Sequence, residues 1–99
     1  MVRVRGGGVD GRHRVKIFAV SYCTPCRKAR MFLEENSVEY EYVNIDEADP
    51  EERKEAMIEI GEYLPSRGTA IAYPIIIIDD LSAMIGFDRQ KLSRILELQ

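Results

Sequence analysis

The sequence predicts one α/β domain in which strands and helices alternate along the chain. Two short apolar runs rich in β-branched residues, 15–20 and 75–78, have the length and composition of buried strands. Apolar residues at helical spacing follow Cys26 and Asp49, each time after turn-forming residues. With 99 residues, a hydrophobic fraction of 45% and a charged fraction of 31%, the chain has the size and composition of a globular domain with one core.

The first strand and the first helix flank a turn. Residues 15–20 end at the turn-like segment 21–25, and Pro25 suits the first turn of a helix, where its missing N–H costs no hydrogen bond. We expect this helix to end near Asn36. Its buried face is predicted from apolar residues at helical spacing, which are Ala29, Phe32 and Leu33.

The second strand and helix follow directly. Residues 38–45 alternate between polar and apolar side chains, which predicts a strand with one face wetter than the other. Asp49 is placed to cap the next helix, Pro50 fits its first position, and Glu52 completes a capping-box spacing. The predicted buried stripe of this helix is Ala56, Met57, Ile60 and Leu64.

The next part of the chain predicts a loop and a pair of strands. Residues 65–68 break the helical pattern and lead through a loop to Pro74. Residues 75–78 are bulky on both faces, so we expect helices to bury both sides of that strand. The turn at 79–80 then allows 81–85 to return as an antiparallel neighbour.

A last helix closes the domain. Gly86 breaks the strand pattern, and Asp88 is placed to cap a helix. The buried stripe of this helix is predicted to be Leu92, Ile95 and Leu96. The predicted order of elements is therefore β-α-β-α-β-β-α.

The N-terminal segment differs in charge from the rest of the chain. Residues 1–14 carry four arginines against one aspartate, whereas the remainder carries ten basic and sixteen acidic residues. Because this segment is rich in glycine, we expect a mobile extension, 1–14, ahead of a domain that spans 15–99. His13, the only histidine, ends the extension, and we expect it to be solvated and not catalytic.

Composition also bounds the partners and the compartment. An acidic body argues against nucleic acid as a partner, since phosphate binding needs a basic patch on a folded face. No apolar stretch approaches the roughly 20 residues of a membrane-spanning helix, and no apolar signal-peptide core follows the N-terminal arginines. We expect a cytoplasmic protein without membrane contact. In that reducing compartment, a close cysteine pair is more often catalytic or metal-binding than structural.

The two cysteines of the chain, Cys23 and Cys26, lie where the first predicted strand gives way to the first predicted helix. A helix N-terminus presents unpaired N–H groups and the positive end of the backbone dipole, and both favour a thiolate. In such motifs the pKa of the first thiol falls from roughly 8.5 to about 3.5–7.5. The position therefore predicts thiol chemistry with Cys23 as the nucleophile.

Together these features resemble the glutaredoxin family. The resemblance covers about residues 15–98 and implies a thioredoxin fold, in which helices on both sides enclose a four-stranded mixed sheet in three layers. It also implies that Pro74 is in the cis form and faces the cysteine pair. The motifs that carry it are Tyr22-Cys23-Thr24-Pro25-Cys26 after the first strand, Tyr73-Pro74 before the third, and Gly86-Phe87-Asp88 before the last helix.

A thiol–disulfide oxidoreductase is the activity that this resemblance implies. Cys23 attacks a disulfide of a protein substrate, and Cys26 then resolves the mixed disulfide. Residues expected to contact the substrate or shape its site are Tyr22, Thr24, Pro25, Tyr73, Pro74, Gly86, Phe87 and Asp88. The remaining tyrosines are expected to have a structural role, and they are Tyr40, Tyr42 and Tyr63.

The expected electron donor depends on departures from the typical glutaredoxin pattern. Val20 stands three residues before the first cysteine, where the family usually has a lysine for a glutathione carboxylate. Gly86-Phe87-Asp88 replaces a Gly-Gly pair followed by acidic residues, and Ala72-Tyr73-Pro74 replaces Thr-Val-Pro. The Gly-Phe form is similar to the NrdH-redoxin branch, whose members take electrons from thioredoxin reductase. We therefore favour a protein reductant. Glutathione is the alternative co-substrate, bound through Arg27, Lys28, Arg67 and Asp88.

Three other classes of function fit the sequence less well. A zinc site takes four ligands, whereas the chain has one cysteine pair and a single histidine, so we expect no metal site. An iron–sulfur cluster that bridges a dimer is disfavoured by Pro25 beside the second cysteine. A binding module without catalysis does not require both thiols, and both are present. We expect a monomer without a tightly bound cofactor.

Overall fold

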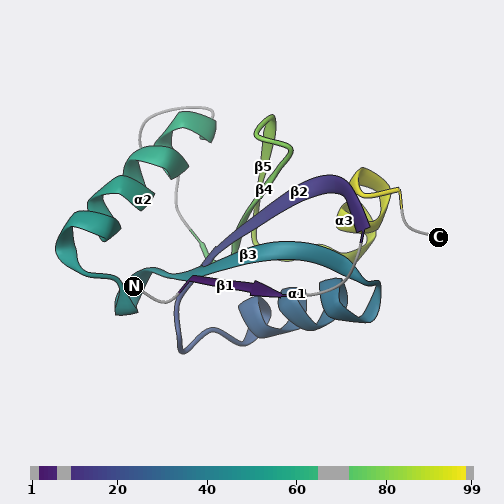
Figure 1. The fold of residues 1–99 in the computed structure, drawn as a ribbon, viewed down its shortest axis with the longest axis horizontal. Coiled ribbons are helices and arrows are strands. Elements are labelled where there is room, and N and C mark those ends of the chain that lie inside the picture. Colours follow the sequence, from purple (N-terminus) through teal and green to yellow (C-terminus); the bar gives the residue numbers. More distant parts are fainter. Residues whose placement is uncertain (1–2, 7–9, 65–71, 98–99) are drawn as a thin grey trace.

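The computed structural model describes residues 3–6, 10–64 and 72–97. In chain order its elements are β1 (Arg3–Gly6), β2 (Asp10–Ala19), α1 (Thr24–Glu35), β3 (Val38–Asn44), the 3-10 turn η1 (Ile45–Glu47), α2 (Pro50–Tyr63), β4 (Ile75–Ile78), β5 (Ser82–Ile85) and α3 (Arg89–Ile95), as Figure 1 shows. From β2 onward, and apart from η1, this is the predicted order β-α-β-α-β-β-α, which is thereby confirmed.

A five-stranded sheet in the order β1-β3-β2-β4-β5 forms the middle of the domain. The central strand β2 runs parallel to β3 and antiparallel to β4. β5 pairs antiparallel with β4, and β1 pairs antiparallel with β3. The strands β2 to β5 are the predicted four-stranded mixed sheet, and β1 extends it by one strand.

Helices cover both faces of this sheet because its central strands are apolar on both sides. Ile17 of β2 packs in one core cluster with residues of α1 and α3, whereas its neighbour Phe18 packs in a second cluster with residues of α2. All four isoleucines of β4 are buried, and they alternate between the two clusters in the same way. The predicted three layers, with two-sided burial of this strand, are therefore present.

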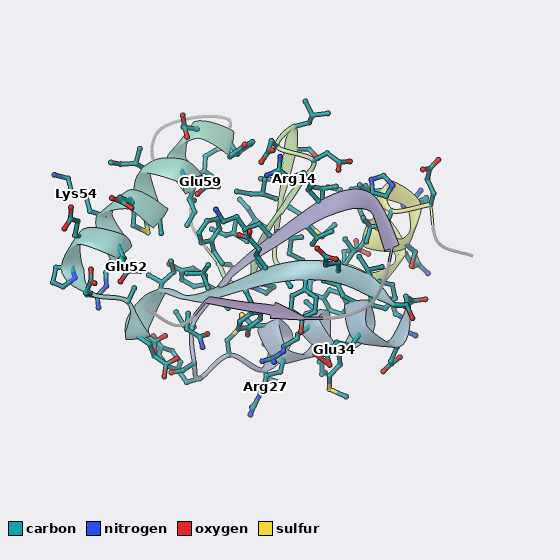
Figure 2. All side chains as sticks on the ribbon, viewed as in Figure 1. Arg14, Arg27, Glu34, Glu52, Lys54 and Glu59 are labelled. Carbon is teal, nitrogen blue, oxygen red and sulfur yellow. A yellow bond between two sulfur atoms is a disulfide. The ribbon has the colours of Figure 1, made fainter. Side chains whose placement is uncertain are left out.

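The first two helices begin and end where the sequence predicted. α1 ends at Glu35, one residue before Asn36, and buries Ala29, Phe32 and Leu33. α2 begins at Pro50, and the side chain of Asp49 accepts a hydrogen bond from the backbone N–H of Glu52 at 2.9 Å. An ion pair holds α2 to the sheet, since Lys16 Nζ on β2 lies 2.8 Å from Glu59 Oε1. Figure 2 shows Glu59 on the side of α2 that faces the sheet.

A few predicted boundaries and burials differ from the structure. Met57 of α2 is 36% exposed, because the sheet covers only the narrow face around Ala56 and Ile60. Strand β5 begins at Ser82, and Leu81 lies in the preceding turn with 84% of its surface exposed. The predicted loop at 65–71 lies outside the described residues. No helix within the described ranges is both long enough and apolar enough to cross a membrane.

The N-terminal segment differs most from the prediction. Instead of a separate extension before Val15, the chain forms β1 at Arg3–Gly6 and begins β2 at Asp10. β1 pairs with β3 from Arg3↔Val43 to Gly6↔Tyr40. The backbone groups along one edge of β3 would otherwise have no strand partner, and pairing with β1 satisfies them.

His13, a residue of β2, contacts the turn between β4 and β5, so the prediction that it is solvated is wrong. Its side chain is only 15% exposed, with Nδ1 at 2.8 Å from Asp79 Oδ2 and Nε2 at 3.4 Å from Glu97 Oε2. Asp79 also accepts a hydrogen bond from the backbone N–H of Arg14 at 2.8 Å. These contacts anchor the turn, in which Asp79 and Asp80 both have φ of 56°.

The hydrogen bond between His13 and Asp79 changes the acidity of both groups. It raises the pKa of His13 above its ordinary 6.5, against a smaller lowering by burial. The same bond, with that from the Arg14 amide, lowers the pKa of Asp79 below its usual 3.8. The folded state therefore favours the charged form of both side chains, and the pair is strongest when the histidine is protonated and the aspartate is not.

We predict that His13→Gln destabilises the fold more at acidic than at alkaline pH. The stabilisation from a histidine with a raised pKa is fully present below about 6.5 and is lost as the pH rises through the folded value. Urea unfolding of both proteins at about pH 5.5 and pH 8.5 measures the difference in free energy. An equal loss at both pH values would contradict the assigned ion pair.

Asp79→Asn should show the opposite dependence on pH. The part of its destabilisation that comes from the lost carboxylate charge should disappear as the pH falls below about 3.8, because the carboxyl group of the unchanged protein is then protonated too.

Candidate functional site

Strand pairing brings three separate parts of the chain to one edge of the sheet. Phe18, near the end of β2, pairs with Ile75 at the start of β4, and Ile75 pairs with Ile85 at the end of β5. The segment after β2, the segment before β4 and the segment after β5 therefore meet. These segments contain the cysteine pair, Tyr73-Pro74 and Gly86-Phe87-Asp88, which are the three motifs singled out in the sequence.

The backbone joins the second and third of these segments. The N–H of Gly86 donates a hydrogen bond to the carbonyl oxygen of Pro74 at 2.7 Å. Gly86 has a φ of +84°, a conformation that L side chains rarely adopt, so glycine suits this turn. The bond between Tyr73 and Pro74 is cis, as the resemblance implied.

The cysteine pair caps helix α1 in its oxidised form. Cys23 and Cys26 form a disulfide with their Cα atoms 5.3 Å apart. Cys23 is also the N-cap residue of α1, and the backbone N–H of Cys26 donates to Cys23 Sγ at 3.1 Å. Thr24 and Pro25 form the first turn of the helix, as predicted for Pro25. A negative charge on the Cys23 sulfur would thus meet a backbone donor and the positive end of the helix dipole.

The two sulfurs differ in access. Cys23 is 8% exposed, whereas Cys26 is fully buried in the core cluster between the sheet and α1. The helix explains the difference, because Cys23 precedes its first turn and Cys26 already lies on its inward face. Of the two residues, only Cys23 keeps any surface open to solvent.

Two tyrosines lie at the same edge of the sheet as Cys23. Tyr22 is 81% exposed and directly precedes Cys23 in the chain. Tyr73 is half-buried and packs against both core clusters. Burial raises the pKa of Tyr73, and the nearby Tyr22 adds to that rise. The structure therefore brings together the two tyrosines that the sequence assigned to the substrate site, and leaves Tyr22 as the more accessible one.

The other predicted contact residues take partly structural positions. Phe87 packs its ring against Phe32 of α1, with centroids 5.8 Å apart. Asp88 caps α3 by accepting a hydrogen bond from the Lys91 backbone N–H at 3.0 Å, as predicted. Tyr40 and Tyr42 are buried in the core, which agrees with the structural role expected for them. Arg67, named for the alternative glutathione site, lies outside the described residues.

Asp46 supports the loop before the cysteines, and sequence reasoning missed it. Its carboxylate accepts hydrogen bonds from the backbone N–H of Ser21 at 2.9 Å and from the Ser21 hydroxyl. These bonds lower the pKa of Asp46 below its usual 3.8. The signal available in the sequence was the position of Asp46 just after the second predicted strand, since parallel neighbouring strands end at the same edge of a sheet.

Arg53 of α2 holds the segment that carries Asp46. Its Nε donates to the carbonyl of Ile45 at 3.2 Å, and its Nη2 donates to the carbonyl of Ala48 at 3.1 Å. These contacts fix η1 against the start of α2. A continuous set of hydrogen bonds therefore links α2, through η1 and Asp46, to Ser21 and the cysteine loop.

The fold and the oxidised cysteine pair define a redoxin of the thioredoxin-like α/β class. A family model described as Glutaredoxin matches residues 15–82, which is more than half of the chain. The chain therefore belongs to the glutaredoxin family. No curated protein matches the sequence.

Solved structures agree with this placement. The glutaredoxin from Methanosarcina mazei Go1 superposes with a TM-score of 0.81 at 30% identity, over 95% of this chain and 86% of that one. The methanoredoxin of Methanosarcina acetivorans gives a TM-score of 0.71 at 26% identity, over 82% and 81%. The glutaredoxin from Archaeoglobus fulgidus, at 24% identity and a TM-score of 0.70 over 92% and 98%, shares the fold.

We predict that Asp46→Ala loosens the cysteine loop without unfolding the domain. The variant removes both acceptors of Ser21, so the Ser21 amide should exchange with deuterium several-fold faster than in the unchanged protein. Ser21→Ala removes only the hydroxyl bond and should leave that amide protected. Glu47→Ala is the matched control, because it removes a neighbouring carboxylate that bonds Asn44 instead. Unchanged exchange of the Ser21 amide in Asp46→Ala would refute the supporting role.

Proposed function

We propose that this protein is a dithiol oxidoreductase that reduces disulfides of other proteins through Cys23 and Cys26. Membership of the glutaredoxin family supports the class of chemistry. The difference in access supports the roles, since Cys23 is 8% exposed and Cys26 is 0% exposed. Thiol–disulfide exchange needs the attacking sulfur to reach the sulfur that it attacks, so exchange with a large partner takes place at Cys23.

The first step forms a mixed disulfide. The Cys23 thiolate attacks one sulfur of the substrate disulfide, and the other substrate sulfur leaves as a thiolate that takes a proton from water. The backbone N–H of Cys26, which lies 3.1 Å from Cys23 Sγ, stabilises negative charge on the attacking sulfur. Tyr22, next to Cys23 in the chain, and Tyr73, at the same edge of the sheet, supply surface against which the substrate chain packs.

The second step releases the substrate. Cys26 loses its proton and attacks Cys23 Sγ, which forms the disulfide present in the structure and expels the second substrate thiolate. Two electrons have then passed from the cysteine pair to the substrate. In this product the Cα atoms of the two cysteines lie 5.3 Å apart, within the range of an ordinary disulfide. Burial keeps Cys26 from reacting with other partners first.

A protein reductant, such as thioredoxin reductase, is the proposed source of these electrons. Val20 occupies the position where typical glutaredoxins carry a lysine for glutathione, and its side chain packs against both core clusters. A cation is therefore absent at that position. No tightly bound cofactor takes part in this scheme, because two thiols supply both electrons.

Substitution of each cysteine tests the two roles. In Cys23→Ser we expect disulfide reduction to fall to the uncatalysed rate, because the accessible thiolate is gone. In Cys26→Ser we expect the mixed disulfide to accumulate to about one substrate per protein, because the resolving thiol is missing. Non-reducing gels and intact mass measure both outcomes. Activity retained in Cys23→Ser would reject the assignment. A mixed disulfide trapped on Cys26 in that variant would reverse the two roles.

The electron donor is tested by supplying NADPH with thioredoxin reductase in one assay and with glutathione plus glutathione reductase in another. We expect turnover of a protein disulfide with thioredoxin reductase and little with glutathione. Val20→Lys should raise the glutathione-dependent rate by restoring the cation. Val20→Met should not, because methionine has an unbranched side chain similar in length to that of lysine but without charge. Turnover with glutathione alone in the unchanged protein would make glutathione the donor.

A further inference from the structure

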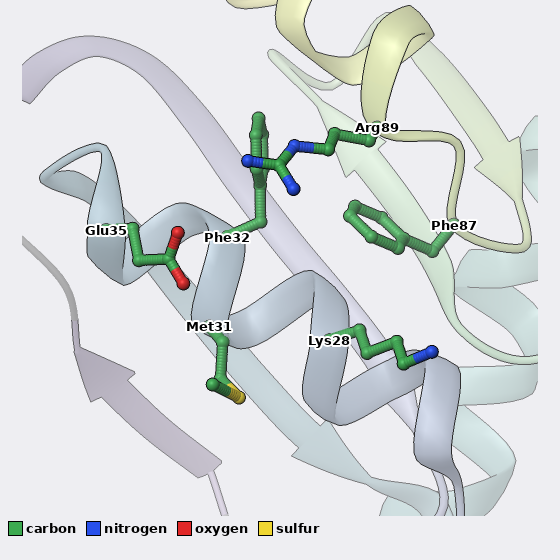
Figure 3. Close-up of a pocket in the computed structure, with 6 residues that line it drawn as sticks. All are labelled: Lys28, Met31, Phe32, Glu35, Phe87 and Arg89. Carbon is green, nitrogen blue, oxygen red and sulfur yellow. The ribbon is translucent and has the colours of Figure 1, made fainter.

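A groove of about 310 Å³ lies between α1 and the segment that leads from β5 into α3. Figure 3 shows Phe87 and Arg89 reaching from that segment toward α1, which contributes the other side chains. The exchange chemistry uses no side chain of α1 beyond Cys26. The groove is lined by Lys28, Met31, Phe32, Glu35, Phe87 and Arg89.

The floor of the groove is apolar. The rings of Phe32 and Phe87 lie 5.8 Å apart and inclined at 54°. Phe32 is buried, whereas Phe87 is half-buried and contributes carbon surface to the groove. Met31 is exposed on the same helix face, although a methionine is more stable when its side chain is covered. An apolar side chain from a partner that packs here would cover surface of Met31 and Phe87.

The rim of the groove is cationic, in contrast to the acidic body of the protein. The Arg89 guanidinium lies 5.3 Å from the centre of the Phe32 ring, and Lys28 is exposed. Across the part of the chain that the structure describes, neither cation makes an ion pair with a carboxylate of the protein. Glu35 is the one carboxylate in the lining. The formal net charge of the chain is −3, so attraction of an anion here must be local.

The groove begins close to the reactive cysteine. Lys28 is two residues beyond Cys26 on α1, and Phe87 packs against the core cluster that includes both cysteines. At 1.5 Å per residue, Lys28 lies about 7.5 Å along the helix axis from Cys23, and Phe32 lies about 13.5 Å from it. An extended peptide rises about 3.3 Å per residue, so these distances correspond to about two and four residues of substrate.

We propose that this groove binds an acidic, apolar segment of the protein substrate next to its reactive cysteine. A carboxylate about two residues from that cysteine meets Lys28, and an apolar side chain about four residues away packs on Phe87 and Met31. The Arg89 guanidinium, over the Phe32 ring, adds positive charge beside that second position. The segment lies extended along α1. This inference rests on the proposed reduction of protein disulfides and adds to it the sequence that the enzyme selects.

Binding can be measured without the redox reaction. The ligand is a nine-residue peptide with serine in place of the central cysteine, glutamate two residues away on each side, and leucine four residues away on each side. In titrations of the oxidised protein followed by amide NMR shifts, we expect changes concentrated at residues 28–35 and 87–89. A peptide with lysine in place of glutamate should bind about fivefold more weakly, and a peptide with glycine in place of leucine should also bind more weakly.

Two double variants test whether the cations of the groove cause the preference for the acidic peptide. Lys28→Gln with Arg89→Gln should remove the preference for glutamate over lysine. The matched control is Lys54→Gln with Arg94→Gln, which changes the net charge equally at exposed positions that do not line the groove and should keep the preference. Figure 2 shows Lys54 on the side of α2 away from the sheet. About 1 M salt should abolish the preference, because it screens exposed charges within a few ångströms.

A kinetic assay extends the test to the reaction. The same peptides with cysteine are linked through a disulfide to 5-thio-2-nitrobenzoate, an aromatic thiolate that leaves readily and absorbs visible light. The ratio of kcat/KM for the acidic peptide to that for the basic peptide should be about five in the unchanged protein and near one in the groove variant. Because the ratio is taken within one protein, any change in the reactivity of Cys23 cancels.

Equal binding of the acidic and basic peptides, shift changes away from the groove, or equal loss in the control variant would each overturn the proposal. Equally tight binding of N-acetylglutamate amide would also overturn it, because the groove would then be a small-anion site. If the peptides bind as expected but none is reduced, the groove is retained as a peptide site and the proposed oxidoreductase function fails. The two proposals can therefore be rejected separately.

Discussion

The pairing of β2 with two different neighbours is the constraint on which the site depends. A parallel partner on one side and an antiparallel partner on the other place the end of β2, the end of β3 and the start of β4 at the same edge of the sheet. β4 then returns β5 to that edge. Two-sided burial of β2 and β4 fixes this register, because a shift by one residue would exchange the side chains that face α1 with those that face α2.

This arrangement also explains why the two cysteines differ in burial. α1 follows β2 after a short turn, so its N-terminus lies at the sheet edge while its body packs on the core. Cys23 sits at the boundary between the two environments, and Cys26 sits inside. The same apolar packing that stabilises the domain therefore makes the two sulfurs unequal.

Much of this could be predicted from the sequence, because its strongest signals are local. The isoleucine run of β4, the cap at Asp49 and the cysteines before a helix each depend on neighbouring residues in the chain. The features that sequence reasoning missed depend on partners far away. His13 meets Asp79 at a separation of 66 residues, and Ser21 meets Asp46 at a separation of 25. Without knowledge of the sheet order, nothing in the local pattern identifies such partners.

The N-terminal segment shows the same limit. Val2 and Val4 alternate with Arg3 and Arg5, a two-residue period typical of a strand. The glycines after them favour a flexible segment, and the choice between the two depended on whether a sheet edge was available. The edge of β3 provides it.

The position of β1 has a practical consequence for the behaviour of the protein in concentrated solution. In the full chain, β1 covers four positions of β3. A shortened chain that began at Val15 would leave β3 as the edge strand of the sheet. The backbone donors and acceptors beside Tyr40 and Tyr42 would then be open to other molecules. Uncovered strand borders promote pairing between chains. Pairing of β1 with β3 would therefore protect the protein against aggregation.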